Sequence, residues 1–299
     1  MITVLGSINM DLVATTSRLP KAGETVSGMN FSTAAGGKGA NQALAARRAG
    51  CDVRMVGAVG KDGFAAPAIE LLAESGVDLS AVRHIDGSTG TASILVDATG
   101  ENVIVVVPGA NGAVDGADVE TALSTMSAGD ILMLQFEVPE PTVEQALKLA
   151  KQRGVTTILN LAPLVPAAER LGRMADIVVA NETEFERLAG KDDMDGATRE
   201  SEMKRLSAET GQCLIVTLGA DGVVAIRDGE LYRASGLVIE PVDTVGAGDT
   251  FCGYLAASLD KGLDFSDALR RAAVAGSLAC LKAGAQPAIP VAGEVAGRL

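Results

Sequence analysis

The segment DILMLQFEVPEPTVEQALKLAKQRGVTTILNL, residues 130–161, shows the unit from which this chain is built. Two short aliphatic runs, 130–135 and 156–161, have the composition of buried strands. The apolar spacing of residues 142–153 between them is that of a helix. A helix that connects two strands over this length crosses from one parallel strand to the next. The segment therefore predicts a βαβ unit.

The same alternation continues in both directions from this unit. Further aliphatic runs predict strands at residues 2–6, 53–59, 176–180 and 213–218. Helical patterns occupy residues 39–49, 64–75 and 198–210, and a paired helical run covers 249–283. Hydrophobic residues make up 47% of the chain and aromatic residues only 3%, so the core has to be mainly aliphatic. These features predict an α/β fold, a doubly wound and mostly parallel sheet flanked by helices.

Two segments, residues 9–35 and 91–107, interrupt the alternation with β-prone runs that no helix separates. The second is predicted to be a hairpin that turns at Asp97–Asn102. We expect a small four-stranded sheet from these segments. Residues 1–8, 36–90 and 108–299 would form the nucleotide-binding α/β domain with the active site. We interpret the small sheet as a lid over that site, and an ordinary edge extension is the alternative.

The lid is expected to have one apolar face, which has to cover a site or a second subunit. The side chains assigned to this face are Ile94, Val96, Val103, Val105 and Val107.

The net charge of −13 and a pI near 4.6 argue against nucleic acid or an anionic membrane as the main partner. No apolar run reaches the ~18 residues that a membrane span needs. The four cysteines are scattered without a CxxC pair, and the chain starts directly with a predicted strand. These features predict a cytoplasmic protein.

The run Asp243–Phe251, DTVGAGDTF, is the most informative local motif. Its small residues at 246–248 let a ligand approach the main chain, and a helical pattern follows at once. Amides at the start of a helix favour an anion, so we expect an anion hole for a phosphoryl group in transfer. Asp249 lies at the edge of this hole, where a carboxylate suits a general base that takes a proton from a hydroxyl. The alternative is that Asp249 only caps the helix.

Two more clusters carry polar groups. The run GGKGANQ, residues 36–42, enters a helix and brings Lys38 and Asn41, which are donors suited to sugar hydroxyls. Asn9-Met10-Asp11 follows the first predicted strand, at the edge where open α/β sheets bind ligands. The chain has no GxxxxGK[ST] loop and no complete GxGxxG fingerprint. These absences disfavour a Walker-type NTPase and a nicotinamide dehydrogenase.

Taken together, these motifs resemble the ribokinase family of carbohydrate kinases over the whole length of the chain. The other matching runs are residues 6–11, 23–25, 57–62, 108–111, 181–184, 217–219 and 284–287. The resemblance implies an ATP-dependent transferase that moves the γ-phosphate to the O5 hydroxyl of D-ribose. It also implies Mg²⁺ with ATP, K⁺ as an activator and a homodimer joined through the lid.

The resemblance assigns roles to the residues at matching positions. The catalytic set is Asp249 with the anion hole of Gly246, Ala247 and Gly248. The sugar-binding set is Asn9, Asp11, Gly37, Lys38, Asn41 and Glu137. The nucleotide-binding set is Asn181, Thr217 and Gly219, while Glu184 would hold Mg²⁺ through water.

The family also implies a monovalent-cation cage beside the anion hole. Its expected ligands are the Asp243 carboxylate and groups of Val245, Ala279, Lys282, Gly284 and Ala288. Ala288 departs from the family, because a Ser is common there and its hydroxyl would be a further ligand. We therefore expect weaker binding of K⁺ than in a cage that has the Ser.

Other functions stay open at this stage. A different sugar or a nucleoside is the main alternative substrate, although two Tyr and no Trp leave few rings to stack on a base. A non-catalytic sugar-binding protein is a second alternative, which the intact Asp249 and NxxE motifs disfavour.

Overall fold

The computed structural model describes all 299 residues of the chain. Its main sheet has nine strands in the order β13-β12-β11-β10-β9-β8-β1-β4-β5. Seven neighbouring strands are parallel, and β12 and β13 continue the sheet antiparallel at one edge. The strands are β1 Ile2–Leu5, β4 Val53–Gly60, β5 Asp78–Ile85, β8 Ile131–Leu134, β9 Thr156–Asn160, β10 Ile177–Asn181, β11 Cys213–Thr217, β12 Val223–Arg227 and β13 Glu230–Ala234. The predicted fold class is confirmed.

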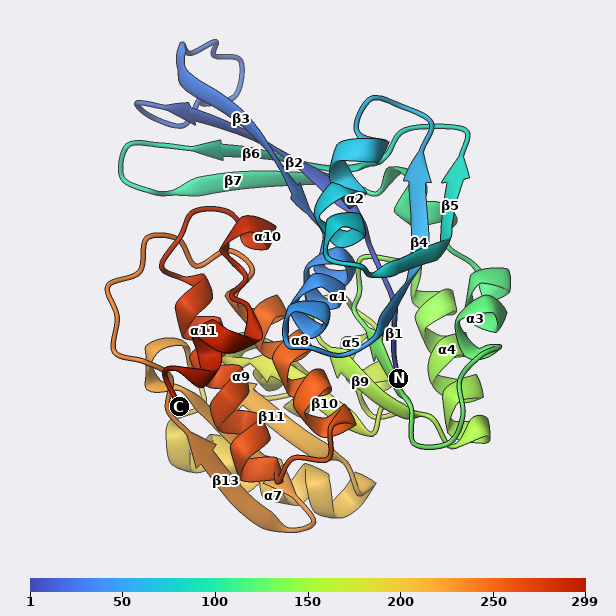
Figure 1. Cartoon of the computed structure of the whole chain (residues 1–299). Helices are drawn as coiled ribbons and strands as arrows, with labels where there is room; N and C mark the ends of the chain where they lie inside the picture. Colours follow the sequence, from blue (N-terminus) through green and yellow to red (C-terminus); the bar gives the residue numbers. More distant parts are fainter.

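Helices cover both faces of this sheet (Figure 1). One face packs against α1 Lys38–Arg48, α2 Ala65–Glu74, α8 Ala247–Asp260 and α9 Phe265–Ala279. The other packs against α3 Gly116–Leu123, α4 Glu140–Arg153, α5 Ala168–Gly172, α6 Glu182–Ala189 and α7 Gly196–Thr210. Neighbouring strand residues such as Val178 and Val179 belong to opposite cores, as the alternation of a strand requires.

Short elements complete the chain, namely α10 Ala285–Ala288, α11 Ala292–Ala296 and the 3₁₀ turns η1 Gly109–Ala113 and η2 Gly219–Asp221. No helix combines the length and hydropathy that a membrane crossing requires. Cys51, Cys213 and Cys252 are buried free thiols, and Cys280 is half-buried.

The sequence patterns missed several elements of the main domain. Strands β5, β12 and β13 were not predicted, and neither were helices α3 and α6. The residues of β5 and β13 are mostly exposed or half-buried, because these strands lie at the two edges of the sheet. Edge strands lack the continuous apolar run that marks a strand buried on both faces.

A separate sheet has four strands in the order β3-β2-β6-β7. Its strands are β2 Asn9–Thr16, β3 Gly28–Gly36, β6 Gly90–Val96 and β7 Asn102–Val107. Figure 1 shows this sheet projecting from the main body above α10. The β6–β7 pair is the hairpin that the sequence predicted, with its turn at 97–101.

The predicted composition of the apolar face was wrong, because it combined side chains from both faces of this sheet. Ile94 pairs with Ile104, while Ser93 pairs with Val105. Side chains paired across a ladder share a face, so Ile94 and Val105 point to opposite sides. In a strand without polar alternation, the sequence does not indicate which side chains share a face. The pairing with the neighbouring strand shows it.

We call the two sides the inner and the outer lid face. The inner lid face carries Asp11, Val13, Ile94, Val96, Ile104 and Val106. The outer lid face carries Phe31, Leu95, Val103, Val105 and Val107.

Candidate active site

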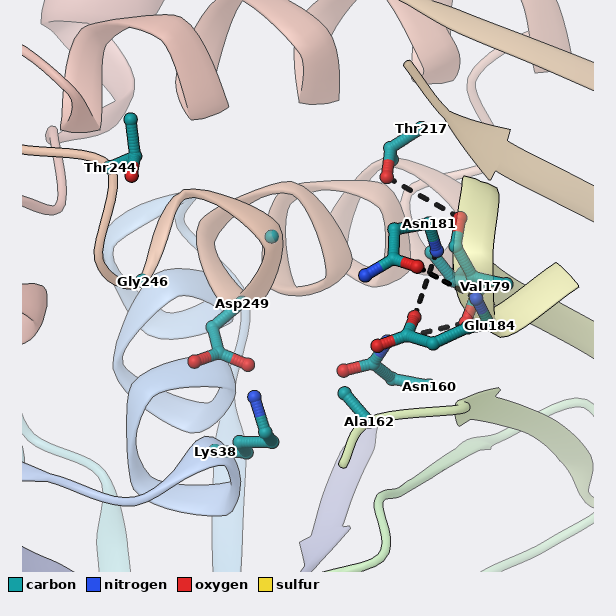
Figure 2. A pocket seen from close by; sticks show the side chains of 12 residues that line it. Lys38, Asn160, Ala162, Val179, Asn181, Glu184, Thr217, Thr244, Gly246 and Asp249 are labelled. Carbon is teal, nitrogen blue, oxygen red and sulfur yellow. Dashed lines mark hydrogen bonds between the residues drawn. The ribbon is translucent and has the colours of Figure 1, made fainter. Parts of the chain in front are cut away.

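A cavity of about 220 Å³ lies where the parallel strands end at their carboxyl edge (Figure 2). It is lined by seven residues that the sequence predicted, namely Lys38, Asn181, Glu184, Thr217, Gly246, Gly248 and Asp249. It is also lined by five residues that were not predicted, namely Asn160, Ala162, Val179, Ala180 and Thr244. The fold therefore brings segments from α1, β9, β10, β11 and α8 to one place.

Asp249 lies buried in the first turn of α8. Its Oδ2 accepts a hydrogen bond from Nδ2 of Asn41 at 2.9 Å, and its Oδ1 accepts one from Nε2 of Gln42 at 3.0 Å. The side chain thus faces the cavity and does not cap its own helix, for which no side-chain cap bond exists. This contradicts the capping alternative for Asp249.

Asn41 was predicted to bind sugar, and its amide nitrogen contacts Asp249 here. Its oxygen is buried without a hydrogen-bond partner, so the predicted contact with sugar stays a prediction. Sequence reasoning missed Gln42, although the predicted helix places it directly beside Asn41.

Lys38 extends its ammonium group toward Asp249 (Figure 2). Burial of this group lowers its pKa, but the carboxylates of Asp249, Glu137 and Glu184 raise it, and the net shift is upward. The amine is therefore firmly protonated and supplies the positive charge of an otherwise acidic site.

The loop before α8 has the geometry of the predicted anion hole. Gly246 has a φ of 76°, and a Cβ built on it would lie 2.9 Å from Cβ of Ala285 in α10. The amides of Gly246, Gly248 and Asp249 find no acceptor within the chain, whereas the Ala247 amide donates to the Thr244 carbonyl at 3.3 Å. Three unpaired amides at a helix start suit a phosphoryl oxygen.

Glu137 lies just beyond β8 and opposite the start of α1. Its Oε2 accepts hydrogen bonds from Oγ of Ser7 at 2.6 Å and from the Lys38 amide at 3.0 Å. Oε1 has no partner within the chain, so one oxygen is anchored and the other is available to a ligand. Ser7 is fully buried, and its anchoring role was not evident from the sequence.

Asn9 and Asp11 enter from the first strand of the lid sheet. Nδ2 of Asn111 donates to Oδ1 of Asn9 at 2.6 Å, which leaves the Asn9 amide nitrogen free to donate. Burial raises the pKa of Asp11 to about 6, and the charges of Glu137 and Asp249 add to this. Gly37, with a φ of 89°, packs so closely against Ser7 and Asn9 that a side chain there would clash.

Asn181 and Glu184 form a capping box at the start of α6. The main-chain amide of Asn181 donates to Oε2 of Glu184, and the main-chain amide of Glu184 donates to Oδ1 of Asn181, both at 2.8 Å. Burial raises the pKa of Glu184. One oxygen of Glu184 is thus held by a main-chain amide, and burial destabilises the charged form of the carboxylate. A cation nearby would stabilise that charge, so these residues suit Mg²⁺ held through water.

A second cavity of about 420 Å³ adjoins the first and shares Thr217, Thr244 and Gly248 with it. Of the predicted nucleotide residues, Thr217 and Gly219 line it. Its apolar wall was not predicted and comprises Leu237, Val238, Ile239, Pro241, Phe251 and Ala273. A largely apolar cavity next to an anion hole has the polarity that suits a nucleotide base.

The residues of the predicted cation cage lie beside the anion hole and not in either cavity wall. Oδ1 of Asp243 accepts from the Val245 amide at 3.0 Å, and Oδ2 accepts from the Gly284 amide at 2.8 Å. Ala279 and Ala288 are buried, and Lys282 lies between them in the chain. Both oxygens of Asp243 thus accept from main-chain amides, and the carbonyl ligands expected for K⁺ stay a prediction.

Comparisons with known proteins extend over the same length. The pfkB family of carbohydrate kinases matches residues 1–292. A ribokinase of Haemophilus influenzae is 36% identical over 98% of this chain and 96% of its own, and one of Bacillus subtilis is 38% identical over 98% and 97%. The structure of an Arabidopsis thaliana ribokinase with ribose and ATP has a TM-score of 0.90 and 33% identity, covering 99% of this chain and 97% of its own. By sequence and by fold, the chain belongs to the pfkB family of carbohydrate kinases.

Proposed function

We propose that this kinase transfers the γ-phosphate of ATP to the O5 hydroxyl of D-ribose and releases ribose 5-phosphate. The observation that carries the proposal is the placement of Asp249. Asp249 lines the cavity together with Lys38, Gly246 and Gly248, next to three main-chain amides at the start of α8 that have no acceptor. Full-length similarity to ribokinases supports ribose as the acceptor.

In this proposal, the sugar binds between α1 and the inner lid face. Asp11 and the free oxygen of Glu137 accept bonds from ring hydroxyls, while the Asn9 amide and the Lys38 ammonium donate. Asp249 takes the proton of the O5 hydroxyl as that oxygen attacks the phosphorus atom in line. The amides of Gly246, Gly248 and Asp249 stabilise the charge that builds on the phosphoryl oxygens.

The nucleotide base would lie in the apolar cavity beside Thr217 and Gly219. Mg²⁺ would be held near Glu184 and Asn181 and would neutralise charge on the β- and γ-phosphates. Closure of the lid sheet would exclude water and so limit hydrolysis of ATP. The absence of paired cysteines supports a reducing compartment, and we propose the cytoplasm.

The inner lid face supports a second candidate substrate. Ile94, Val96, Ile104 and Val106 form an apolar surface on the side that also carries Asp11. Such a surface could pack against the base of a nucleoside, so a nucleoside kinase is the runner-up.

A coupled assay of ADP release over a panel of pentoses, hexoses, fructose 6-phosphate and adenosine tests the proposal. We expect D-ribose to have the highest kcat/KM, because each polar group left unpaired by a wrong sugar costs about 1–3 kcal/mol. Asp249→Asn should lower kcat by about 10²–10⁴ with little change in sugar affinity.

A nucleoside that is phosphorylated better than ribose would replace the substrate assignment with the runner-up. An Asp249→Asn variant that keeps more than about a tenth of wild-type kcat would remove Asp249 as the base.

A further inference from the structure

Two buried glutamines that do not line the cavity connect to Asp249 through hydrogen bonds. Gln42 in α1 is 1% exposed and Gln135, directly after β8, is 0% exposed. Nε2 of Gln135 donates to Oε1 of Gln42 at 2.7 Å, and Nε2 of Gln42 donates to Oδ1 of Asp249 at 3.0 Å. We propose that these two hydrogen bonds position the catalytic base. Gln135 donates to Gln42 and Gln42 donates to Asp249, and we call this series the donor relay. The inference rests on the proposed role of Asp249.

The direction of the relay follows from the chemistry of its members. An ionised carboxylate can only accept hydrogen bonds, so Gln42 has to turn its NH₂ group toward Asp249. The second N–H of this group donates to Oδ1 of Asn160 at 3.2 Å. That oxygen is itself fixed as an acceptor, because Nδ2 of Asn160 donates to the Val179 carbonyl at 3.2 Å.

With both N–H groups of Gln42 engaged, its oxygen has to face Gln135. A neighbour at 2.7 Å from an amide oxygen in a dry interior must be a donor, since two opposed acceptors repel. Gln135 therefore acts in this contact as a hydrogen-bond donor, through Nε2. If Gln42 turned over, its oxygen would oppose both Asp249 and Asn160.

The oxygen of Gln135 supports this interpretation. Oε1 is buried and has no hydrogen-bond partner. It lies in the space that Gly6 leaves open, where a Cβ at position 6 would come within 2.2 Å of it. An unpaired buried amide oxygen destabilises the fold, so a glutamine at this position is better explained by its donor than by packing.

The relay acts on the reaction by holding one oxygen of the base. Gln42 anchors Oδ1 of Asp249, and Asn41 anchors Oδ2, so the plane of the carboxylate is set from two sides. Each oxygen keeps a further lone pair for the substrate hydroxyl. Gln42 and Gln135 are thus positioning residues, and their loss should affect kcat and leave KM for sugar and ATP nearly unchanged.

Two substitutions of Gln135 separate a donor relay from mere packing. Gln135→Met keeps the volume and removes the donor, so kcat should fall by only about threefold, because Gln42 still prefers to face Asp249. Gln135→Glu is isosteric and places an acceptor against Oε1 of Gln42. At pH 8 it should turn the Gln42 amide away from Asp249 and lower kcat by about 10- to 100-fold.

The pH profile gives the decisive readout. Burial favours the neutral form of the introduced carboxyl group, which donates to Gln42 once it is protonated. The kcat of Gln135→Glu relative to wild type should therefore rise as the pH falls from 8 to 6, and the ratio for Gln135→Met should stay flat. Equal kcat for the two variants with parallel pH profiles would overturn the relay.

Gln212→Glu is the matched control. Gln212 is also buried and donates through Nε2 to the carbonyls of Gly172 and Ala175, at the opposite end of the strands. The same charge change there should lower the melting temperature and leave the pH profile of kcat parallel to that of wild type. A rising ratio in this control as well would assign the effect to global stability and overturn the proposal.

A measurement without turnover keeps the relay separate from the proposed function. The chain has six glutamines, so selective ¹⁵N labelling gives a small set of side-chain amide signals by NMR. The Gln42 signals should shift strongly in Gln135→Glu at pH 8 and return toward wild type at pH 6. Gln42 signals that stay unchanged in both Gln135→Glu and Gln135→Met would refute the relay, whereas a wild-type protein inactive on all sugars would refute only the proposed function.

Discussion

Two carboxylates of the candidate site differ sharply in their surroundings. Asp249 is anchored by two amide donors, whereas Asp11 has no hydrogen-bond donor within the chain. Asp11 is largely buried and faces the charges of Glu137 and Asp249, so its pKa rises to about 6. Burial and the neighbouring charges therefore destabilise the ionised form of Asp11, and hydrogen bonds from ligand hydroxyls can offset this effect.

Sugar affinity is expected to depend on pH through Asp11. Only the ionised carboxylate accepts bonds from two sugar hydroxyls, so the Kd for ribose should be constant above pH 7 and rise as the pH falls through about 6. At pH 5 the increase should be about tenfold, measured by titration calorimetry. Asp11→Asn should bind ribose weakly at every pH.

The same shift predicts an effect on folding. Because the folded-state pKa of Asp11 exceeds the usual 3.8, the folded protein binds more protons between these values. Stability therefore falls as the pH rises from about 4 to 6 and stays reduced above that. Asp11→Asn should raise the melting temperature at pH 7. A lower melting temperature, or a wild-type Kd that is flat down to pH 5, would contradict the role given to Asp11.

At the scale of elements, the start of α8 depends on a neighbouring segment. Asp243 ties the loop before α8 to Gly284, and α10 packs directly against Gly246. The Cys280 carbonyl also accepts from the amides of Val242 and Asp243. Residues 279–288 thus help to fix the loop that carries the proposed anion hole.

K⁺ is expected to activate the enzyme through this contact. The ion would hold the loop at 243–246 and not touch the substrate, so its effect should appear mainly in kcat. KCl would be titrated at constant ionic strength with a bulky organic cation as the balance. Ala288→Ser should lower the half-activating concentration by about threefold, since it adds a hydroxyl ligand.

Ala296→Ser, on the exposed side of α11, is the control and should leave the K⁺ titration as in wild type. Full activity without K⁺, or an unchanged titration in Ala288→Ser, would mean that protein contacts alone hold this loop.

At the scale of the whole molecule, the lid sheet is joined to the main body at a buried polar contact. Asn111, just beyond β7, bonds to both main-chain groups of Ile8 and to the Asn9 side chain. These bonds tie the chain at the start of β2 to the chain beyond β7. A contact of this kind couples the position of the sheet to Asn9, which is a predicted sugar ligand.

The outer lid face predicts a homodimer. Phe31 is 64% exposed and Val105 is 58% exposed, and exposed apolar surface of this kind tends to be covered by another subunit. Val105→Lys should therefore give monomers in light scattering at micromolar concentration. Ile104→Lys is a matched control, because Ile104 is 51% exposed but lies on the inner lid face, and it should stay dimeric.

A monomeric wild-type protein would refute the dimer. Monomers from both variants would show that the interface is not confined to the outer lid face.

How much of the fold the sequence predicts depends on how buried each element is. The six predicted strands are all present, because a strand covered on both faces has a continuous aliphatic run. The edge strands β5 and β13 alternate irregularly, and their place in the sheet depends on their neighbours. The two lid faces could not be predicted either, since a run such as 103–107 has the same composition on both sides.

The sequence by itself determined the fold class and predicted the chemistry of the site. Glycines before a helix predict an anion hole, and an acidic residue there predicts a base, because both depend on residues adjacent in the chain. The tertiary structure alone decided what holds that base. Asn41 and Asp249 are 208 positions apart and Gln42 and Gln135 are 93 apart, so no local pattern records their contact. The direction of each amide in that contact follows from the carboxylate, which can only accept, and from burial, which removes water as an alternative partner.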